Sequence, residues 1–256
     1  MKVSVWGLVS GLVFSLLFGC ATNAPLKTLY YRNNEYAFQK NMIIFLRGYS
    51  GSNKDFASNG FIDDVRIRKL PFDMAAPDAK PGYYFGETLI QRLRADVIEP
   101  ARAKGYRRFW LVGVSIGGLG AIMYMLKHPD DIEGVLVISP FLGYYWIIHE
   151  IRNAGGVRKW EPGKYDPDKD WQRMLWDSLK QLATSKKSRL NELYLGYGTE
   201  DTFAAAQKLL GDLLPHDHVI ITSGGHTAET MERIWRLFLE KDVLRSSGSA
   251  VGIDLR

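Results

Sequence analysis

The stretch Gly113-Val114-Ser115-Ile116-Gly117 decides the fold, because an apolar run precedes it and a segment of small and apolar residues follows it. Residues 109–112 have the length and composition of a buried strand, and residues 119–123 continue as a helix. A strand that meets a helix through so tight a turn holds the central serine on strained backbone with its hydroxyl exposed. Glycines on both sides remove the side chains that would clash there. The pattern predicts that Ser115 is placed as a nucleophile.

The pentapeptide belongs to a chain in which predicted strands and helices alternate. Such repeated alternation implies a mostly parallel sheet with helices on both faces, so the sequence predicts the α/β class. The predicted strands are residues 42–46, 72–76, 108–113, 135–138, 193–197 and 218–222, and the predicted helices are residues 88–104 with a kink at Pro100, 117–127, 202–213 and 229–240.

An edge hairpin is predicted before the first buried strand. Residues 26–31 and 35–38 have the composition of strands, and they flank the turn pair Asn33-Asn34. We expect these two short strands to pair with each other at an edge of the sheet.

Three polar residues follow predicted strands at their carboxyl ends, which is the edge where parallel sheets bind ligands. They are Ser115, Asp201 and His226. Their order along the chain, together with the glycine-flanked serine, resembles the α/β-hydrolase family. The resemblance covers residues 41–241 at the level of motif order and strand–helix alternation, and it implies the sheet of that family.

The resemblance implies a role for each of the three residues. Ser115 would attack a carbonyl carbon, His226 would accept the serine proton, and Asp201 would hold the imidazole in the correct tautomer. Glu200 stays an alternative for the acid, because an error of one residue in the turn would exchange the two carboxylates. Either carboxylate could instead cap the helix that begins near Thr202.

Five histidines compete for the role of general base. His226 follows Ser223-Gly224-Gly225, where the glycines let the backbone turn over the sheet edge toward Ser115. We therefore expect His226 to be the base, the alternative being a surface loop histidine without a role. The other four are His128, His216 and His218, toward the opposite end of the sheet, and His149, inside a long insertion.

Acyl transfer also needs backbone amides that bind the oxyanion. The resemblance implies that the amide of Ile116 is one donor. The segment Arg47-Gly48-Tyr49 resembles the family's His-Gly-X segment, which would make the Tyr49 amide the second donor, although Arg47 stands where the family has His. The alternative for this segment is an ordinary turn after a strand.

The stretch of residues 141–190 is far longer than a normal strand-to-helix connection. In the α/β-hydrolase family an insertion at this point forms a cap over the active site. Most of its many aromatic side chains are expected to pack the cap onto the domain. Tyr144, Tyr145 and Trp146, nearest to the active edge, are the predicted substrate-binding residues, lining an apolar or ring-binding pocket.

The N-terminal segment has the pattern of an export signal. Lys2 begins it, an apolar stretch of residues 3–18 follows, and Gly19 and Cys20 end it. Such a stretch could just span a bilayer, but its short basic head and small-residue tail favour a secretory signal over residues 1–19. The segment resembles a bacterial lipobox, which implies cleavage before Cys20 and attachment of acyl chains such as palmitate. Ala21 follows the cysteine rather than Asp, and the resemblance to Gram-negative lipoproteins then implies the outer membrane, facing the periplasm.

Composition excludes several classes of partner. The formal net charge of +5 is a mild excess, and no basic stripe with interleaved aromatic residues indicates nucleic acid. Histidines are not grouped with Cys or carboxylates at metal-ligand spacing, and no glycine loop of the phosphate-binding type precedes a helix. The sequence therefore predicts no metal and no organic cofactor.

These patterns together predict a lipid-anchored serine hydrolase, with residues 20–256 as one α/β-hydrolase domain. The predicted reaction is cleavage of a carboxylic ester, apolar or aromatic, through an acyl-enzyme. A peptidase or a thioesterase would use the same residues. A surface lipoprotein that keeps the fold to bind a ligand, without catalysis, is the alternative from another class.

Overall fold

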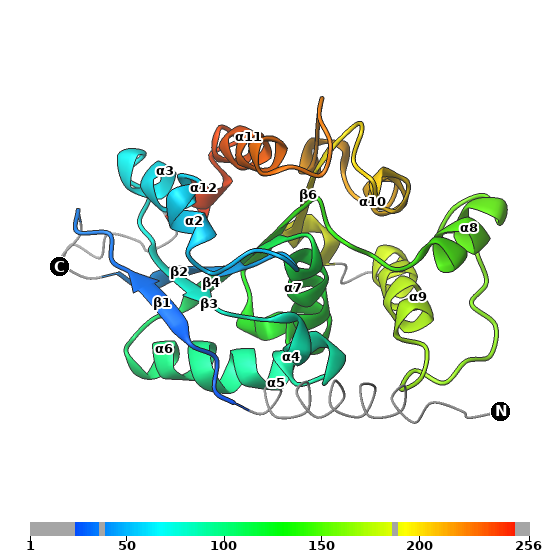
Figure 1. Cartoon of the computed structure of the whole chain (residues 1–256), viewed down its shortest axis with the longest axis horizontal. Coiled ribbons are helices and arrows are strands. Elements are labelled where there is room, and N and C mark those ends of the chain that lie inside the picture. The colour runs from blue at the N-terminus through cyan, green and yellow to red at the C-terminus, as the bar shows by residue number, and fades with distance from the viewer. Residues whose placement is uncertain (1–23, 36–38, 186–188, 249–256) are drawn as a thin grey trace, which may run out of the picture.

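The computed structural model describes residues 24–35, 39–185 and 189–248. Its centre is a seven-stranded sheet in the order β1-β3-β2-β4-β5-β6-β7 (Figure 1). Every neighbouring pair is parallel except β1 with β3, so the predicted mostly parallel sheet is confirmed. The strands are β1 (Thr28–Tyr31), β2 (Asn41–Leu46), β3 (Asp73–Pro77), β4 (Arg108–Val114), β5 (Gly134–Ile138), β6 (Leu193–Gly198) and β7 (Val219–Thr222).

Helices cover both faces of this sheet, which explains why the central strands are apolar on both sides. In Figure 1, α3 and α11 lie on one face, and α5, α6 and α7 lie on the other. The helices are α2 (Asp55–Ser58), α3 (Phe61–Ile67), α4 (Pro81–Phe85), α5 (Leu89–Leu93), α6 (Glu99–Ala103), α7 (Ile116–Lys127), α8 (Tyr145–Asn153), α9 (Trp171–Thr184), α10 (Ala204–Gly211), α11 (Ala228–Leu239) and α12 (Val243–Gly248).

Alternate residues of β2 point into two separate cores. Ile44 and Leu46 pack with the α5–α7 side, whereas Ile43 and Phe45 pack with α3 and α11. This alternation follows from the two-residue period of a strand. Since both faces are buried, a shift of one residue in register would exchange the two sets without exposing either to water.

The predicted helix over residues 88–104 is divided in the structure. α5 is followed by a π-helical turn, Arg94–Ile98, and then by α6. Pro100 lies in the first turn of α6, where its missing N–H interrupts the regular hydrogen-bond ladder. The wider turn directly before Pro100 is the local form that the predicted kink takes.

The edge strand β1 pairs antiparallel with β3, from Thr28 opposite Pro77 to Tyr31 opposite Met74. The predicted partner, residues 35–38, lies mostly outside the described residues. Asn33 is buried rather than exposed in a turn. Its backbone N–H donates to Asp73 Oδ1 at 2.8 Å, and its side chain donates to the Leu70 carbonyl at 2.7 Å.

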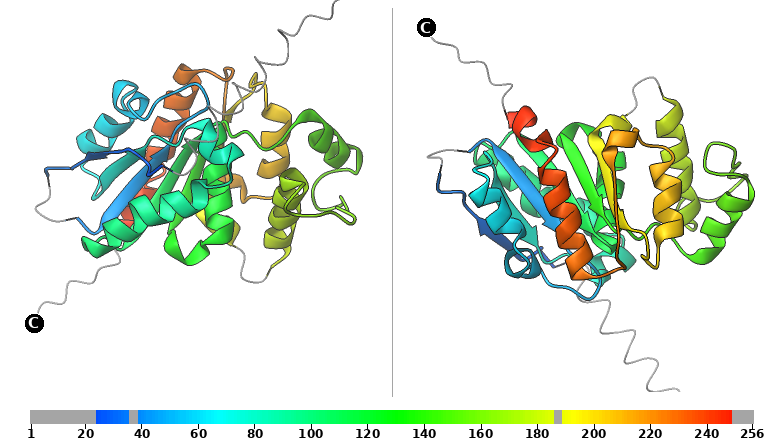
Figure 2. Two further views of the ribbon diagram at one scale, coloured as in Figure 1. Left: turned by 60° about the horizontal axis from the view of Figure 1, so that its bottom comes forward. Right: turned by 90° about the horizontal axis from the view of Figure 1, so that it is seen from above.

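The long connection between β5 and β6 contains α8 and α9, which lie together at one end of the molecule in both views of Figure 2. Among the described residues, no helix is both long enough and apolar enough to cross a bilayer. The predicted signal over residues 1–19 and the predicted lipid attachment at Cys20 lie outside the described residues.

Candidate active site

Ser115 lies between β4 and α7 on strained backbone, with φ 55° and ψ −118°. Glycine is required at the two neighbouring positions, because any side chain there would clash with the backbone. A Cβ on Gly117 would come within 2.1 Å of the Leu46 carbonyl oxygen, and a Cβ on Gly113 would come within 2.2 Å of the Gly117 oxygen. The tight turn expected from the pentapeptide is therefore present, and close packing of three backbone segments allows only glycine beside the serine.

The three residues predicted at the strand ends meet in one hydrogen-bonded row. His226 Nε2 lies 3.1 Å from Ser115 Oγ, and His226 Nδ1 lies 3.0 Å from Asp201 Oδ2 and 3.1 Å from Oδ1. The Asp201 side chain is fully buried, whereas the ring of His226 is 25% exposed. This order places the imidazole between a hydroxyl and a carboxylate, each within reach of one ring nitrogen.

A turn after β6 fixes Asp201. Its backbone N–H donates to the Gly198 carbonyl at 3.1 Å, and its Oδ1 accepts from the Phe203 N–H at 2.8 Å. Burial raises the pKa of the Asp201 carboxyl, but the hydrogen bonds from His226 and the Phe203 N–H outweigh it and leave that pKa below its ordinary value. Glu200, the alternative acid, is exposed and accepts from the Thr199 hydroxyl instead.

The loop before His226 crosses the end of β6. The Gly224 carbonyl accepts from the Glu200 N–H at 3.0 Å, and a Cβ on Gly198 would lie 2.0 Å from that same oxygen. After the histidine, Thr227 caps α11 by accepting from the Thr230 N–H. The chain is thus held on both sides of His226, so the position of the ring depends on the sheet edge and on a helix start.

The other histidines lie in different surroundings. The exposed His149 ring lies 3.1 Å from the Asn153 side-chain amide. His218 stacks on Tyr194, with ring centroids 4.0 Å apart, and its Nδ1 lies 3.1 Å from the Leu193 carbonyl. His128 packs against Tyr124, and His216 begins the short 3-10 turn before β7.

The segment predicted to supply the second oxyanion amide lies against the nucleophile. A Cβ built on Gly48 would be 3.5 Å from the Cβ of Ser115. Arg47 is buried, and its guanidinium donates to the Tyr49 carbonyl at 3.2 Å and lies 3.5 Å from the Asp78 carboxylate. Arg47 therefore braces the turn that carries the Tyr49 amide.

Aromatic rings extend from the histidine toward the insertion. Phe203 meets the His226 ring edge-on, with centroids 5.1 Å apart, and Phe141 lies 5.3 Å from Phe203. Tyr144 continues the row 5.4 Å from Phe141, and its side chain is mostly exposed. Of the three predicted substrate-binding residues, Tyr144 is the one that these ring contacts join to His226.

The other two predicted substrate-binding residues contact the insertion itself. Tyr145 lies 5.4 Å from the His149 ring, and the Trp146 ring lies 5.8 Å from the Arg173 guanidinium. Trp160 and Trp176 are buried, as expected for rings that pack the insertion onto the domain.

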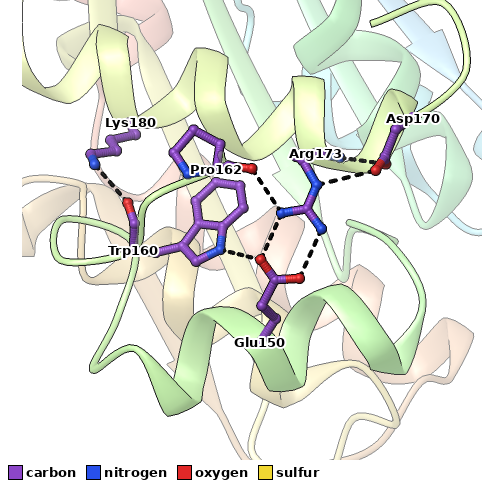
Figure 3. Close-up of polar contacts among 6 residues, drawn as sticks. All are labelled: Glu150, Trp160, Pro162, Asp170, Arg173 and Lys180. Atoms are coloured by element: carbon purple, nitrogen blue, oxygen red, sulfur yellow. Dashed lines mark hydrogen bonds and ion pairs between the residues drawn. The ribbon is translucent and has the colours of Figure 1, made fainter. Parts of the chain in front are cut away.

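A charged network holds α8 and α9 together (Figure 3). Arg173 of α9 donates two hydrogen bonds to Glu150 of α8, at 2.6 and 2.8 Å, and the Trp160 indole N–H donates to the same carboxylate at 2.7 Å. Asp170 accepts from Arg173 at 3.2 Å. Paired contacts of this kind fix the angle between two helices, so Tyr144 and Trp146 lie at the start of a braced helix.

Sequence reasoning missed three residues near the site. Phe203 lies against His226, Ser139 is buried at the carboxyl end of β5, and Gln172 accepts from the Tyr144 N–H at 2.5 Å. Only Ser139 had a usable signal, because it follows a predicted strand next to the one that leads to Ser115. Among the described residues, no group of three or more His, Cys, Asp or Glu could hold a metal ion.

Comparison with known proteins identifies the family of the chain. The family model Esterase, described as "Putative esterase", matches residues 21–215, which is more than half of the chain. Ser115 and Asp201 lie inside the matched stretch, and His226 lies after it. No curated protein sequence matches the chain.

Solved structures share the fold at low sequence identity. A ferulic acid esterase is 15% identical with a TM-score of 0.55, and it covers 87% of this chain and 98% of its own. Est1E from Butyrivibrio proteoclasticus, solved with ferulic acid bound, is 13% identical with a TM-score of 0.55, covering 85% and 95%. The S-formylglutathione hydrolase FrmB from Staphylococcus aureus is 12% identical with a TM-score of 0.53, covering 86% and 98%. The chain belongs to the Esterase family and is a carboxylic-ester hydrolase with the α/β-hydrolase fold.

Proposed function

We propose that the chain hydrolyses carboxylic esters through an acyl-enzyme on Ser115, with His226 as general base and Asp201 as the acid that orients it. The observation that carries the proposal is the hydrogen-bonded row from Ser115 Oγ through the His226 ring to the Asp201 carboxylate, at 3.0 to 3.1 Å. The lowered pKa of Asp201 supports it, because an ionised carboxylate stabilises the imidazolium that forms.

In the first half-reaction, His226 Nε2 takes the proton of Ser115 as Oγ bonds to the carbonyl carbon. The carbonyl electron pair moves to oxygen and then returns, which breaks the bond to the alcohol oxygen, and that oxygen leaves with the proton from His226. In the second half-reaction, water attacks the acyl carbon while His226 takes its proton. The proton then passes to Ser115 Oγ as the acid departs.

The amides of Tyr49 and Ile116 would bind the oxyanion in both half-reactions. The close approach of Gly48 to Ser115 and the hydrogen bond from Arg47 to the Tyr49 carbonyl support this assignment. Loss of one such donor costs about 2.7–4 kcal/mol of transition-state stabilisation. In this chain Arg47, which stands where the family's His-Gly-X segment has histidine, supports the turn through its hydrogen bond to the Tyr49 carbonyl.

The proposed substrate is an ester with an apolar or aromatic group, bound along Phe203, Phe141 and Tyr144. These rings contact one another edge-on, in a series that begins at the His226 ring, which supports an apolar surface beside the reacting atoms. Est1E, which was solved with ferulic acid bound, and the ferulic acid esterase both share the fold of this chain. Ferulic acid, named for both proteins, agrees with a substrate whose acid group is aromatic. Tyr145 and Trp146 are proposed to contact the more distant part of the substrate.

For the whole chain we propose residues 1–19 as a lipoprotein signal, lipid on Cys20, and residues 20–256 as the hydrolase domain with residues 141–190 as its cap. This would anchor the enzyme to the outer membrane, facing the periplasm. The support is the sequence pattern alone. Metabolic labelling with a palmitate analogue, with Cys20→Ser as the control, tests the anchor.

A fluorophosphonate probe tests the mechanism. We expect it to label the purified protein at Ser115, and we expect Ser115→Ala to lose both labelling and hydrolysis of 4-nitrophenyl acetate. A folded protein that is neither labelled nor active would favour the non-catalytic binding protein. A panel of ester, thioester and peptide substrates then separates the esterase from a thioesterase or peptidase that uses the same residues.

A further inference from the structure

Ser139 is a buried residue beside the site that the mechanism above does not use. It follows β5, its side chain is fully buried, and its backbone N–H donates to the Gly196 carbonyl at 2.7 Å. Its φ is 48°, in the left-handed region that non-glycine residues seldom adopt. Glycine would fit this backbone with less strain, so the presence of serine points to a use for the side chain.

The same kind of strain occurs at the nucleophile. Ser115 and Ser139 directly follow residues 114 and 138, which are paired in β4 and β5, and both serines have positive φ. The other non-glycine residues with positive φ in the described ranges are Lys69, Glu87 and Asp242, which do not directly follow a strand. Backbone strain at two adjacent strand ends is typical of a site where side-chain position has a function.

The hydroxyl of Ser139 has a neighbour that can accept its proton. Its Oγ is buried and has no hydrogen-bond partner. The backbone places it beside the end of β6 that carries Asp201, since the Ser139 N–H donates to the Gly196 carbonyl at 2.7 Å and the Asp201 N–H donates to the Gly198 carbonyl at 3.1 Å. The lowered pKa of the Asp201 carboxyl, to which Ser139 contributes, agrees with this placement. Asp201 Oδ1 already accepts from Phe203, whereas Oδ2 has only the His226 ring. A carboxylate has about four acceptor positions, so this one can take a further donor.

We propose that Ser139 is a positioning residue for the row of Ser115, His226 and Asp201: its hydroxyl donates to the Asp201 carboxylate and holds it toward His226. The inference rests on the proposed function, in which Asp201 faces an imidazolium during the reaction. The contact would restrict the carboxylate from one side while the Phe203 N–H restricts it from another.

Removal of the Ser139 hydroxyl is expected to shift the pH dependence of activity in one direction. The groups that face Asp201 are the ring of His226, the N–H of Phe203 and the hydroxyl of Ser139; Glu200 is exposed and turned to Thr199. A carboxylate that loses a donor has more charge available for the imidazolium, so the imidazolium persists to higher pH. The acid limb of activity then moves upward, because the general base must be neutral.

The test is Ser139→Ala in the whole chain. We expect the acid limb of kcat/KM, and of the fluorophosphonate labelling rate, to move up by about half a pH unit. We expect kcat to fall about threefold to tenfold, the effect of losing one hydrogen bond of ordinary strength, with KM within about twofold. Ser139→Cys, a weaker donor in the same place, should lie between Ser139→Ala and the parent chain.

Two further variants keep the result decisive. Ser139→Gly removes the hydroxyl and relieves the backbone strain, so it should show the same shifted limb even if Ser139→Ala folds poorly. Thr199→Val removes a hydroxyl from the neighbouring turn and should leave the limb unchanged. An NMR titration of the His226 ring gives the same comparison without turnover, so it separates this proposal from the proposed hydrolysis. A ring that titrates identically in the parent chain and in Ser139→Gly would overturn the role of Ser139.

Discussion

Two paired aspartates lie beyond opposite ends of α7, Asp201 buried and Asp131 partly buried, and their partners differ in whether they can release a proton. Asp201, near Ser115 at the start of the helix, pairs with an imidazole. Asp131, past its end, accepts from the Tyr124 hydroxyl and from Arg102, each at 2.8 Å. In both carboxyls burial raises the pKa, and the partners outweigh it and lower the pKa overall.

The two clusters differ in whether the partner of the aspartate can release a proton near neutral pH. An imidazole exchanges its proton near neutral pH, whereas a guanidinium keeps its own. Burial and Asp131 both raise the pKa of Tyr124, so this phenol also stays protonated. A paired carboxylate thus becomes part of a reaction centre only where its partner can release a proton beside a nucleophile.

The largest effect is expected for His226→Ala. Because this variant removes the only group in the row that can carry the proton, kcat/KM for 4-nitrophenyl acetate should fall about 10⁴-fold or more. Tyr124→Phe, the matched change at the other aspartate, should leave kcat/KM within about twofold. A similar loss of activity in both variants would break the distinction between the two clusters.

The converse change, Asp131→Asn, should act on stability. It removes the charge of the carboxylate that accepts from Tyr124 and Arg102 but keeps one acceptor oxygen. One hydrogen bond to a charged group contributes about 1.5–3 kcal/mol. We expect the free energy of unfolding in urea to fall by about 2–3 kcal/mol, with kcat/KM unchanged. An equal loss of stability in Asp201→Asn with its activity retained would reverse the assignment.

A second aspartate–tyrosine pair is expected to contribute to stability in a way that depends on alkaline pH. Tyr106 donates to Asp73 at 2.5 Å, and burial, followed by this hydrogen bond and the Asp73 charge, raises its pKa to about 12. Because the folded pKa exceeds the unfolded value of 10.0, the contribution is complete below that pH and is lost as pH rises toward about 12. Tyr106→Phe should therefore flatten the alkaline fall in stability, measured by urea unfolding at pH 8 to 11. At pH 8 it should cost about 1–2 kcal/mol.

The smallest effect on activity is expected at Tyr144, the aromatic ring farthest from His226 in the series of ring contacts. Tyr144→Ala should raise KM for an aryl ester about threefold to tenfold, since an aromatic contact contributes about 0.5–1.5 kcal/mol. Tyr145→Ala, without a ring contact toward His226, should change it less than about twofold. Equal KM values for methyl ferulate in the two variants would place the substrate elsewhere.

Much of the architecture could be predicted from periodicity, because strands buried on both faces are uninterrupted apolar runs and the glycines around Ser115 permit only one kind of turn. The row of Ser115, Asp201 and His226 could be predicted as candidates because strand order brings carboxyl ends to one edge. The choice between Asp201 and Glu200 could not, since it depends on which carboxylate the turn after Gly198 directs inward. The pairing of β1 with β3 depends on Asn33 reaching Asp73, a contact between residues distant in sequence that leaves no periodic signal.

The direction of β1 determines which edge of the sheet lies nearest to the proposed lipid anchor. Because β1 runs against β3, the described chain enters at the carboxyl edge, where the Tyr83 hydroxyl donates to the Ala24 carbonyl at 3.0 Å. From Cys20 to Ala24 an extended chain reaches about 14 Å. With lipid on Cys20, as proposed, so short a tether would keep the carboxyl edge of the sheet, where Ser115 lies, close to the membrane surface.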